Sequence, residues 1–368
     1  MNDQVFVNVN KIIERDNKTS TYKFALLRGT IDIIQENSPF IKISENSVEI
    51  PTGLLIEKWL LYYYPILESK TYIPQINGEK LAFENQFKTV IEYYSTKNGF
   101  SAFYNDFKNK GIPDEIQNDF IDLAKKLRDT ITKMPMKYIG RSINNGYYSI
   151  FQYSNNRMSK NKVIDFESII HDFGTFSIPF DYYEVFKILG SFISGQDAIL
   201  FKWAEFSINA SKKNLTLEKV VGEILKSPVK DRKVEESRNL YDRIIQKNNT
   251  VYCVWSGKEI SICDIDHMIP FSIWKNNDLW NLLPSDPKTN NNKRDKIPSP
   301  ELIEKQKDLI LYYWEIAYEN NPVRFQKEIQ IALLGNIPFE LWKEKAIIQL
   351  QKSCEYLIEK RGYELWKI

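Results

Sequence analysis

Apolar side chains recur three to four residues apart along most of the chain. This period places them on one face of an α-helix that packs against a core. It predicts helices over residues 21–36, 52–68, 87–94, 115–132, 182–208, 217–225, 235–247, 301–318, 325–334 and 339–357. Pro51 stands just ahead of the second of these helices, and Pro65 is expected to bend or end it.

Two stretches interrupt the helical period. Between residues 138 and 180, Asn145-Gly146 is a turn signal flanked by Tyr, Ile and Phe, which predicts a short hairpin. Residues 251–269 form a β-rich segment, with strands expected over 251–255 and 260–265 around a turn at residues 256–258. The predicted fold class is therefore α+β and mainly α-helical, with one small ββα insert.

The same pattern predicts how the chain is divided into domains. Residues 1–225 form a mainly helical region with the hairpin near 138–160, and its expected role is substrate recognition or regulation. Residues 226–247 form a linker and a helix, because the segment KSPVKDRK (226–233) contains Pro228. Residues 248–300 form the ββα module, and the helices of residues 301–368 are expected to pack on it.

Composition narrows the class of protein. The net charge of the 368 residues is only +2, so any surface for nucleic acid must be a local patch. The three cysteines show no paired spacing, which argues against a disulfide framework and favours packed thiols. No segment resembles a signal peptide or approaches the ~18 uninterrupted apolar residues of a membrane span. We therefore expect a cytoplasmic protein that does not enter a membrane.

One segment collects chemistry suited to phosphodiester cleavage. It reads DIDHMIP over residues 264–270, followed by Asn281 and by NNNK over residues 290–293. Strand alternation places Asp264 and Asp266 on one face, and Pro270 ends the strand and begins a loop expected over residues 271–283. Asp286-Pro287 predicts a helix start, which would place Asn290 and Lys293 on one helix face.

The order and spacing of these residues resemble the HNH endonucleases of the ββα-metal superfamily over roughly residues 251–298. The matching segments are DIDHMIP, WNLLP and NNNKRDKIP. The resemblance is nearest to the HNH domains of RNA-guided CRISPR effectors and of bacterial restriction and phage-defence nucleases. It implies a metal-dependent endonuclease that cleaves DNA.

The resemblance implies a role for each matching residue. His267 would be the general base that activates water, and its neighbour Asp266 would bind the metal directly. Asn290 would be the second metal ligand, and Asn281 would brace the loop that fixes the histidine. Two oxygen ligands leave most of the shell open, which suits Mg²⁺ or Mn²⁺. Two roles stay open for Asp264. It is either a solvent-facing carboxylate, or a residue that supports the metal ligands or helps to bind the metal.

The chain departs from the family pattern at two points. Many HNH proteins hold a zinc ion with paired CxxC motifs, but Cys253 is followed three residues later by Ser256. We therefore predict no structural zinc, and expect Trp255, Trp274 and Trp280 to hold the insert together with the flanking helices. Arg294 stands where Gly often follows the lysine.

Contacts with nucleic acid are expected from two groups of cations. Lys293 and Arg294 would contact phosphate, with a structural contact as the other interpretation of Lys293. The hairpin supplies Arg141, Arg157 and Lys160 among tyrosines, and a solvated hairpin is the equally weighted alternative.

His171 and the run of three tyrosines are expected to have structural roles. His171 has no matched partner, which favours a structural histidine. Tyr62-Tyr63-Tyr64 is more typical of a core or a domain interface than of a ligand site.

Two other functions stay open at this point. One is a nickase or homing-type nuclease with a defined site. The other is a nucleic-acid-binding or complex-forming subunit whose HNH fold is gated or inactive without a partner. The expected partners are DNA, a separate sensor or ATPase subunit, and a second copy of the chain in a homodimer.

Overall fold

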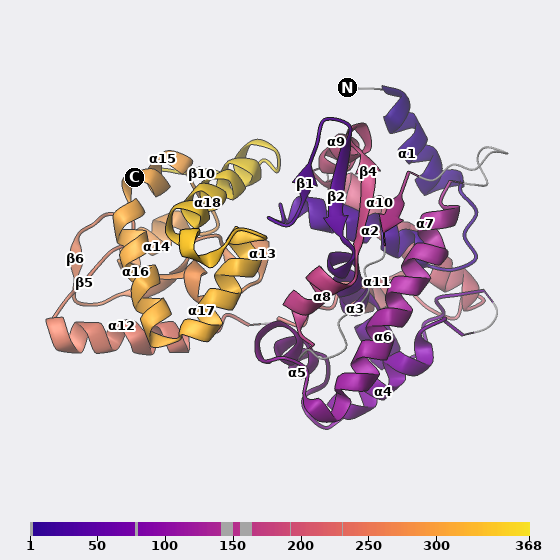
Figure 1. The fold of residues 1–368 in the computed structure, drawn as a ribbon, viewed down its shortest axis with the longest axis horizontal. Helices are drawn as coiled ribbons and strands as arrows, with labels where there is room; N and C mark the ends of the chain where they lie inside the picture. The colour runs from indigo at the N-terminus through magenta and orange to yellow at the C-terminus, as the bar shows by residue number, and fades with distance from the viewer. Residues whose placement is uncertain (1–2, 78–79, 141–149, 155–163, 192, 230) are drawn as a thin grey trace. The chain divides into compact units, whose positions relative to one another are not determined.

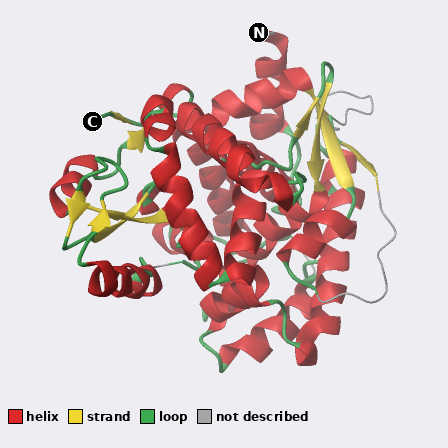
Figure 2. Ribbon diagram, turned by 60° about the vertical axis from the view of Figure 1, so that its left-hand side comes forward, coloured by secondary structure: helices red, strands yellow, loops and turns green. Residues whose placement is uncertain are grey.

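The computed structural model describes residues 3–77, 80–140, 150–154, 164–191, 193–229 and 231–368. The chain folds into two compact units. Unit 1 comprises residues 1–36 and 40–228, and unit 2 comprises residues 37–39 and 229–368. Helices dominate both units and the strands form small sheets (Figure 1, Figure 2). The predicted class, α+β and mainly helical, is confirmed.

Unit 1 is built around two buried helices, α2 (Tyr22–Gln35) and α3 (Thr52–Glu68). The helices that surround them among the described residues are α1 (Asp3–Arg15), α4 (Glu84–Ser95), α5 (Gly99–Asn105), α6 (Asp114–Lys133), α7 (Pro135–Tyr138), α8 (Phe166–Asp172), α9 (Phe180–Ser191), α10 (Ile193–Ala210) and α11 (Leu217–Ile224). The helix predicted over residues 182–208 corresponds to α9 and α10, and residue 192 between them lies outside the described residues. Pro65 lies inside α3, which continues to Glu68.

Aromatic side chains fill the core of unit 1. Trp59, Tyr63 and Phe83 are fully buried and contact one another, with ring centroids 5.0 to 5.9 Å apart. Tyr64 stacks on Phe100 at 4.9 Å. Large buried rings provide most of the apolar area that stabilises such a helical unit. The tyrosine run of α3 is therefore core, as predicted.

Unit 1 also contains a sheet that the sequence pattern did not predict. Its antiparallel strands run in the order β1 (Lys42–Ile43), β2 (Ser47–Pro51), β4 (Thr175–Pro179) and β3 (Gln152–Ser154). The central pair joins segments far apart in sequence, with Val48 opposite Ile178. The predicted turn at Asn145-Gly146 lies outside the described residues.

Unit 2 contains the predicted ββα region and the C-terminal helices. Its strands are β5 (Val251–Tyr252), β6 (Glu259–Ile260), β7 (Asp264–His267), β8 (Leu282–Ser285), β9 (Ile297–Pro298) and β10 (Leu365–Trp366). Its α-helices are α12 (Glu235–Asn248), α13 (Phe271–Trp274), α14 (Pro287–Lys293), α15 (Pro300–Lys305), α16 (Lys307–Asn320), α17 (Pro322–Ile329) and α18 (Trp342–Glu359).

Two sequence predictions in unit 2 are wrong in detail. The strand expected over residues 260–265 is divided: β6 pairs with β5, whereas β7 begins at Asp264 and pairs with β8. The segment from Phe271 to Leu283, expected to be a loop, contains α13 and a 3₁₀ turn at Leu279–Asn281, and then enters β8. Pairing with β8 fixes the register of the motif strand.

One hydrophobic core joins the small strands of unit 2 to its C-terminal helices. Trp255, Trp280 and Trp314 are fully buried in it, and the Trp314 indole N–H donates to the Trp280 carbonyl at 2.7 Å. The three cysteines are buried free thiols. The strands that carry the motif therefore rest on helices α16 to α18, which belong to the same unit.

Candidate active site

Strand β7 displays the central motif. Asp266 lies opposite Leu283 and His267 opposite Leu282 in the antiparallel pair with β8. Because successive strand residues point to opposite faces, Asp264 and Asp266 share one face and His267 lies on the other. Pro270 then ends the strand and begins the turn into α13. The carboxylates of Asp264 and Asp266 and the imidazole of His267 therefore lie on opposite faces of β7.

Asp266 is buried, with 4% of its surface exposed. Its carboxylate accepts one hydrogen bond from the Trp255 indole N–H at 2.6 Å and one from the Lys293 ammonium at 3.0 Å. Burial raises the pKa of the Asp266 carboxyl, while the Lys293 charge and these hydrogen bonds act in the opposite direction. The carboxylate is therefore held in one orientation before any ligand binds.

Lys293 is fully buried and also donates to the His267 carbonyl at 2.7 Å. It serves here as the structural contact that was one of its two predicted roles. A phosphate contact would require the ammonium to leave this ion pair. Arg294, the next residue, is exposed with a φ of 52°.

Helix α14 brings the predicted amide ligand against β7. Asp286 caps its N-terminus by accepting from the Thr289 N–H at 3.0 Å, and Pro287 occupies the first turn, as predicted. Asn290 is half-buried and donates from Nδ2 to the Asp264 carboxylate at 3.3 Å. Asp264 is thus the carboxylate that directly faces Asn290.

Asn281 ties the loop after the motif to the strand. It is fully buried, its Oδ1 accepts from the Ile269 N–H at 2.7 Å, and its Nδ2 donates to the Ile269 carbonyl at 3.0 Å. A third bond runs from Nδ2 to the Asn276 side chain at 2.9 Å. This geometry fits the bracing role predicted for Asn281.

His267 is 4% exposed, and its imidazole contacts one side chain of α13 and one of the loop after it. Its Nε2 is 3.3 Å from the Asn277 Oδ1, and its ring centroid is 5.5 Å from that of Phe271. Burial lowers the pKa of His267 to about 4, and the Asn277 contact acts against that shift. The imidazole is therefore neutral at pH 7, which is the form that can accept a proton.

The residues fit a divalent metal ion by donor chemistry. Asp264, Asp266 and Asn290 supply carboxylate and amide oxygens, which are the ligands that Mg²⁺ and Mn²⁺ prefer. Asn290 would offer its Oδ1 after a turn of the amide, whose Nδ2 now faces Asp264. The carboxylates and the amide come from β7 and α14, two elements in contact with each other.

Three further residues belong to this site but were not predicted as part of it: Trp255, Asn277 and Arg232. Trp255 was expected only as a packing residue. Arg232 lies within the predicted linker segment KSPVKDRK (226–233), and its guanidinium is 6.0 Å from the Phe271 ring centroid. Its charge acts on the pKa of both Asp266 and His267. The predicted contacts Arg141, Arg157 and Lys160 lie outside the described residues.

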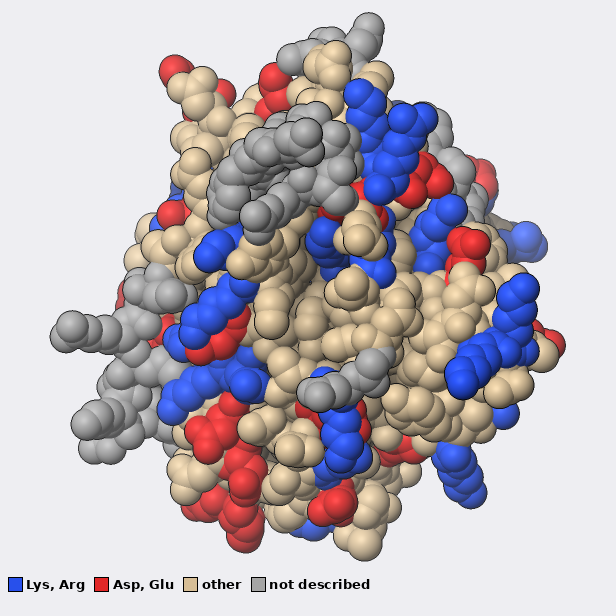
Figure 3. Space-filling view, turned by 90° about the vertical axis from the view of Figure 1, so that its right-hand side faces the viewer, with Lys and Arg blue, Asp and Glu red and all other residues tan. Residues whose placement is uncertain are grey.

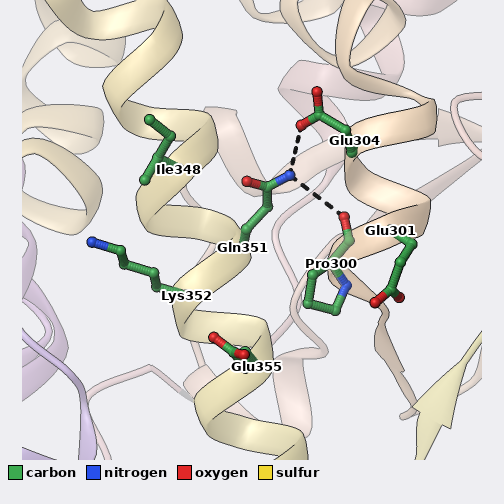
Figure 4. A pocket seen from close by; sticks show the side chains of 7 residues that line it. All are labelled: Pro300, Glu301, Glu304, Ile348, Gln351, Lys352 and Glu355. Atoms are coloured by element: carbon green, nitrogen blue, oxygen red, sulfur yellow. Dashed lines mark hydrogen bonds between the residues drawn. The ribbon is translucent and has the colours of Figure 1, made fainter.

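Two surface features of the described residues lie away from the motif. On the face drawn in Figure 3, the described Lys and Arg side chains are interspersed with Asp and Glu. A shallow groove of about 390 Å³ lies between α15 and α18, where the Gln351 amide reaches Glu304 at 2.8 Å and the Pro300 carbonyl at 3.5 Å (Figure 4). None of the residues that line it belongs to the motif.

Comparison with known proteins gives two matches along the chain. The family described as a domain of unknown function (DUF8808) matches residues 2–224, and the family described as HNH endonuclease matches residues 253–299. No curated protein and no solved structure matches. Among the helices of the described residues, none has the length and apolar character needed to cross a membrane.

Proposed function

We propose that this chain, which belongs to the DUF8808 family and carries an HNH endonuclease domain, is a metal-dependent nuclease that hydrolyses phosphodiester bonds in DNA. The HNH match covers Asp264, Asp266, His267, Asn281, Asn290 and Lys293. The observation that carries the proposal is that β7, β8 and α14 gather these residues around one strand end.

In the proposed mechanism His267 is the general base. Its neutral imidazole takes a proton from the attacking water as the oxygen approaches phosphorus. Asn281 keeps the strand end in place through the Ile269 backbone, so the imidazole does not have to be ordered at the moment of reaction.

Asp266 and Asn290 are the proposed metal ligands, and Asp264 supplies a second carboxylate beside Asn290. A divalent ion bound there would stabilise negative charge on the phosphate and on the leaving oxygen. Lys293 orients the Asp266 carboxylate and offsets its charge. Arg294 and Arg232 are the described cations proposed to contact the DNA backbone.

Unit 1 is proposed to supply substrate choice or regulation. A role in bacterial defence, within the cytoplasm, is also proposed, and the resemblance of the motif to those of restriction and phage-defence nucleases supports it. The second candidate is a nuclease module gated by a partner such as a sensor or ATPase subunit. One observation favours gating: both Asp266 oxygens are already engaged, by Trp255 and Lys293.

Cleavage of supercoiled plasmid tests the proposal. Wild type and His267→Ala are incubated with Mg²⁺, with Mn²⁺ and with EDTA, and nicked and linear products are separated. We expect metal-dependent cleavage that the substitution lowers by about 10²- to 10⁴-fold. Equal cleavage by both proteins would contradict the role of His267. A silent wild type that nevertheless binds DNA would favour the gated module.

A further inference from the structure

The side chain of Asn277 is held by the backbone of residues 231–234, the entry segment that leads into α12. Its Oδ1 accepts from the Lys233 backbone N–H at 2.9 Å, and its Nδ2 donates to the Asp231 carbonyl at 3.1 Å. A backbone N–H can only donate and a carbonyl can only accept. These two bonds therefore fix which end of the amide is oxygen and which is nitrogen.

The fixed orientation of the Asn277 amide determines which nitrogen of the His267 imidazole carries the hydrogen. The same Oδ1 lies 3.3 Å from His267 Nε2, and an amide oxygen can only accept a hydrogen bond. In the neutral imidazole, Nε2 must therefore carry the hydrogen, because a lone pair there would face the oxygen lone pairs. The free lone pair is then on Nδ1, which becomes the nitrogen able to take a proton from water.

The backbone of Asn277 is anchored as well. Its carbonyl accepts from Arg324 Nη2 at 3.1 Å, and Arg324 is held in turn by Glu328 at 2.6 Å and by Glu236 of α12. The Asn277 carbonyl thus has a partner on α17, while the side chain spans from the entry segment to the imidazole. This is more support than a loop residue needs for packing alone.

We propose that Asn277 is a positioning residue for His267, which selects the Nε2–H tautomer and links the backbone of residues 231–233 to the base. The catalytic meaning of this link rests on the proposed function, since it concerns the same histidine. The tautomer itself can be measured without any cleavage. A change in the path of the entry segment would release the amide and with it the orientation of the base.

The experiment is side-chain ¹H–¹⁵N correlation spectroscopy of the full chain labelled with ¹⁵N-histidine, at pH 7.5 in EDTA. The chain has only two histidines, and His171→Gln assigns the spectrum. Wild type is compared with Asn277→Ala, with Asn277→Asp, and with Asn239→Ala as a matched control. Asn239 is an exposed asparagine on α12. Plasmid cleavage by the same proteins gives kcat and KM.

We expect His267 to carry its hydrogen on Nε2 in wild type and in Asn239→Ala. Asn277→Ala should allow the Nδ1–H tautomer, and Asn277→Asp should restore Nε2–H because a carboxylate oxygen still accepts. We also expect Asn277→Ala to lower kcat by about 10- to 100-fold with little change in KM.

An Nδ1–H tautomer in wild type, or an unchanged Nε2–H tautomer in Asn277→Ala, would overturn the inference. If wild type cuts no DNA, the proposal of a nuclease that acts without a partner fails, while the spectra still decide the tautomer. If wild type cuts DNA and Asn277→Ala keeps its kcat, the amide does not position the base.

Discussion

Each unit buries a lysine against carboxylate, yet the two lysines have different surroundings. In unit 1, the Lys58 ammonium lies 2.5 and 2.7 Å from the two oxygens of Glu36 and 3.7 Å from Glu57, and Glu57 also pairs with Lys108. In unit 2, the Lys293 ammonium binds one carboxylate, that of Asp266, and one carbonyl. The first group contains two lysines and two glutamates, so its charges balance.

The two buried lysines differ in the side chains that surround each lysine–carboxylate pair. Burial acts against charge on Lys58, but Glu36 and Glu57 outweigh it and raise the pKa of Lys58. The described side chains of that network include no histidine. Asp266 is followed by His267 and shares its strand face with Asp264, which faces an amide. A buried ion pair therefore marks a candidate site only when a base and further metal-binding oxygens accompany it.

Removing Lys293 should give the largest change in stability. Lys293→Met leaves the buried Asp266 carboxylate without its ammonium partner, which costs about 3–5 kcal/mol. Lys58→Met should cost less, because Glu36 is half exposed to water and Glu57 keeps its pair with Lys108. Urea unfolding gives the free energy of unfolding, and hydrogen exchange locates the loss. We expect faster exchange in α2 and α3 for Lys58→Met, and in β7 and α14 for Lys293→Met.

Exposed lysines serve as controls for this pair of variants. Lys125→Met on α6 and Lys288→Met on α14 should leave the unfolding free energy within about 0.5 kcal/mol of wild type. A Lys293→Met protein as stable as wild type would mean that the ion pair with Asp266 is not the state of the molecule in solution.

The stability of unit 2 is expected to depend on pH through His267. The pKa of His267 is about 4 in the folded protein and ~6.5 when unfolded, so the unfolded state binds more protons between these values. His267 therefore contributes stability that is present above pH ~6.5 and is lost as the pH falls toward 4, by at most about 3 kcal/mol.

Urea unfolding in EDTA across this pH window, with His267→Gln as reference, checks the expectation. The Asp266 carboxyl, whose pKa is raised, contributes with the opposite sign and is present in both proteins. The difference between the two proteins should therefore shrink as the pH falls. A difference that does not change with pH would show that His267 is not held neutral by burial.

A smaller effect is expected from Arg232, which is exposed beside the site. Arg232→Gln should weaken DNA binding by roughly 1 kcal/mol and lower the slope of log affinity against log salt by about 0.9. Binding titrations at several salt concentrations measure both. Lys305→Gln, at an exposed position on α15, should change neither. An unchanged slope for Arg232→Gln would remove this residue from the DNA surface.

The sequence missed helices α1, α5 and α8 but predicted α2, α3 and α6 well, because the signal of these three is local. The period that marks α2, α3 and α6 is contained in each segment, and the structure places all three within a residue or two of the prediction. The sheet of unit 1 was missed because β2 pairs with β4, which is far away in the sequence. The residues of neither strand indicate which other segment it pairs with. The division of the 260–265 strand was missed for the same reason, since β7 pairs with β8.

Some residues of the candidate site could likewise be predicted from the sequence, and others could not. Asp266, His267, Asn281 and Asn290 could be chosen in advance because spacing and residue type carry a family pattern. Asn277 could not, because its role depends on backbone groups of residues 231 and 233 that the fold brings to it. Trp255 was expected to pack, and the sequence gives no sign that its N–H binds Asp266.

The most direct test of the whole account is the cleavage rate of plasmid DNA by His267→Ala beside that of Lys58→Met, at equal concentrations of folded protein and with Mg²⁺ or Mn²⁺. We expect His267→Ala to lose about 10²- to 10⁴-fold in rate, while Lys58→Met cleaves within a few-fold of wild type. Cleavage by His267→Ala at the wild-type rate, or its loss in Lys58→Met alone, would contradict the assignment of the nuclease site to unit 2.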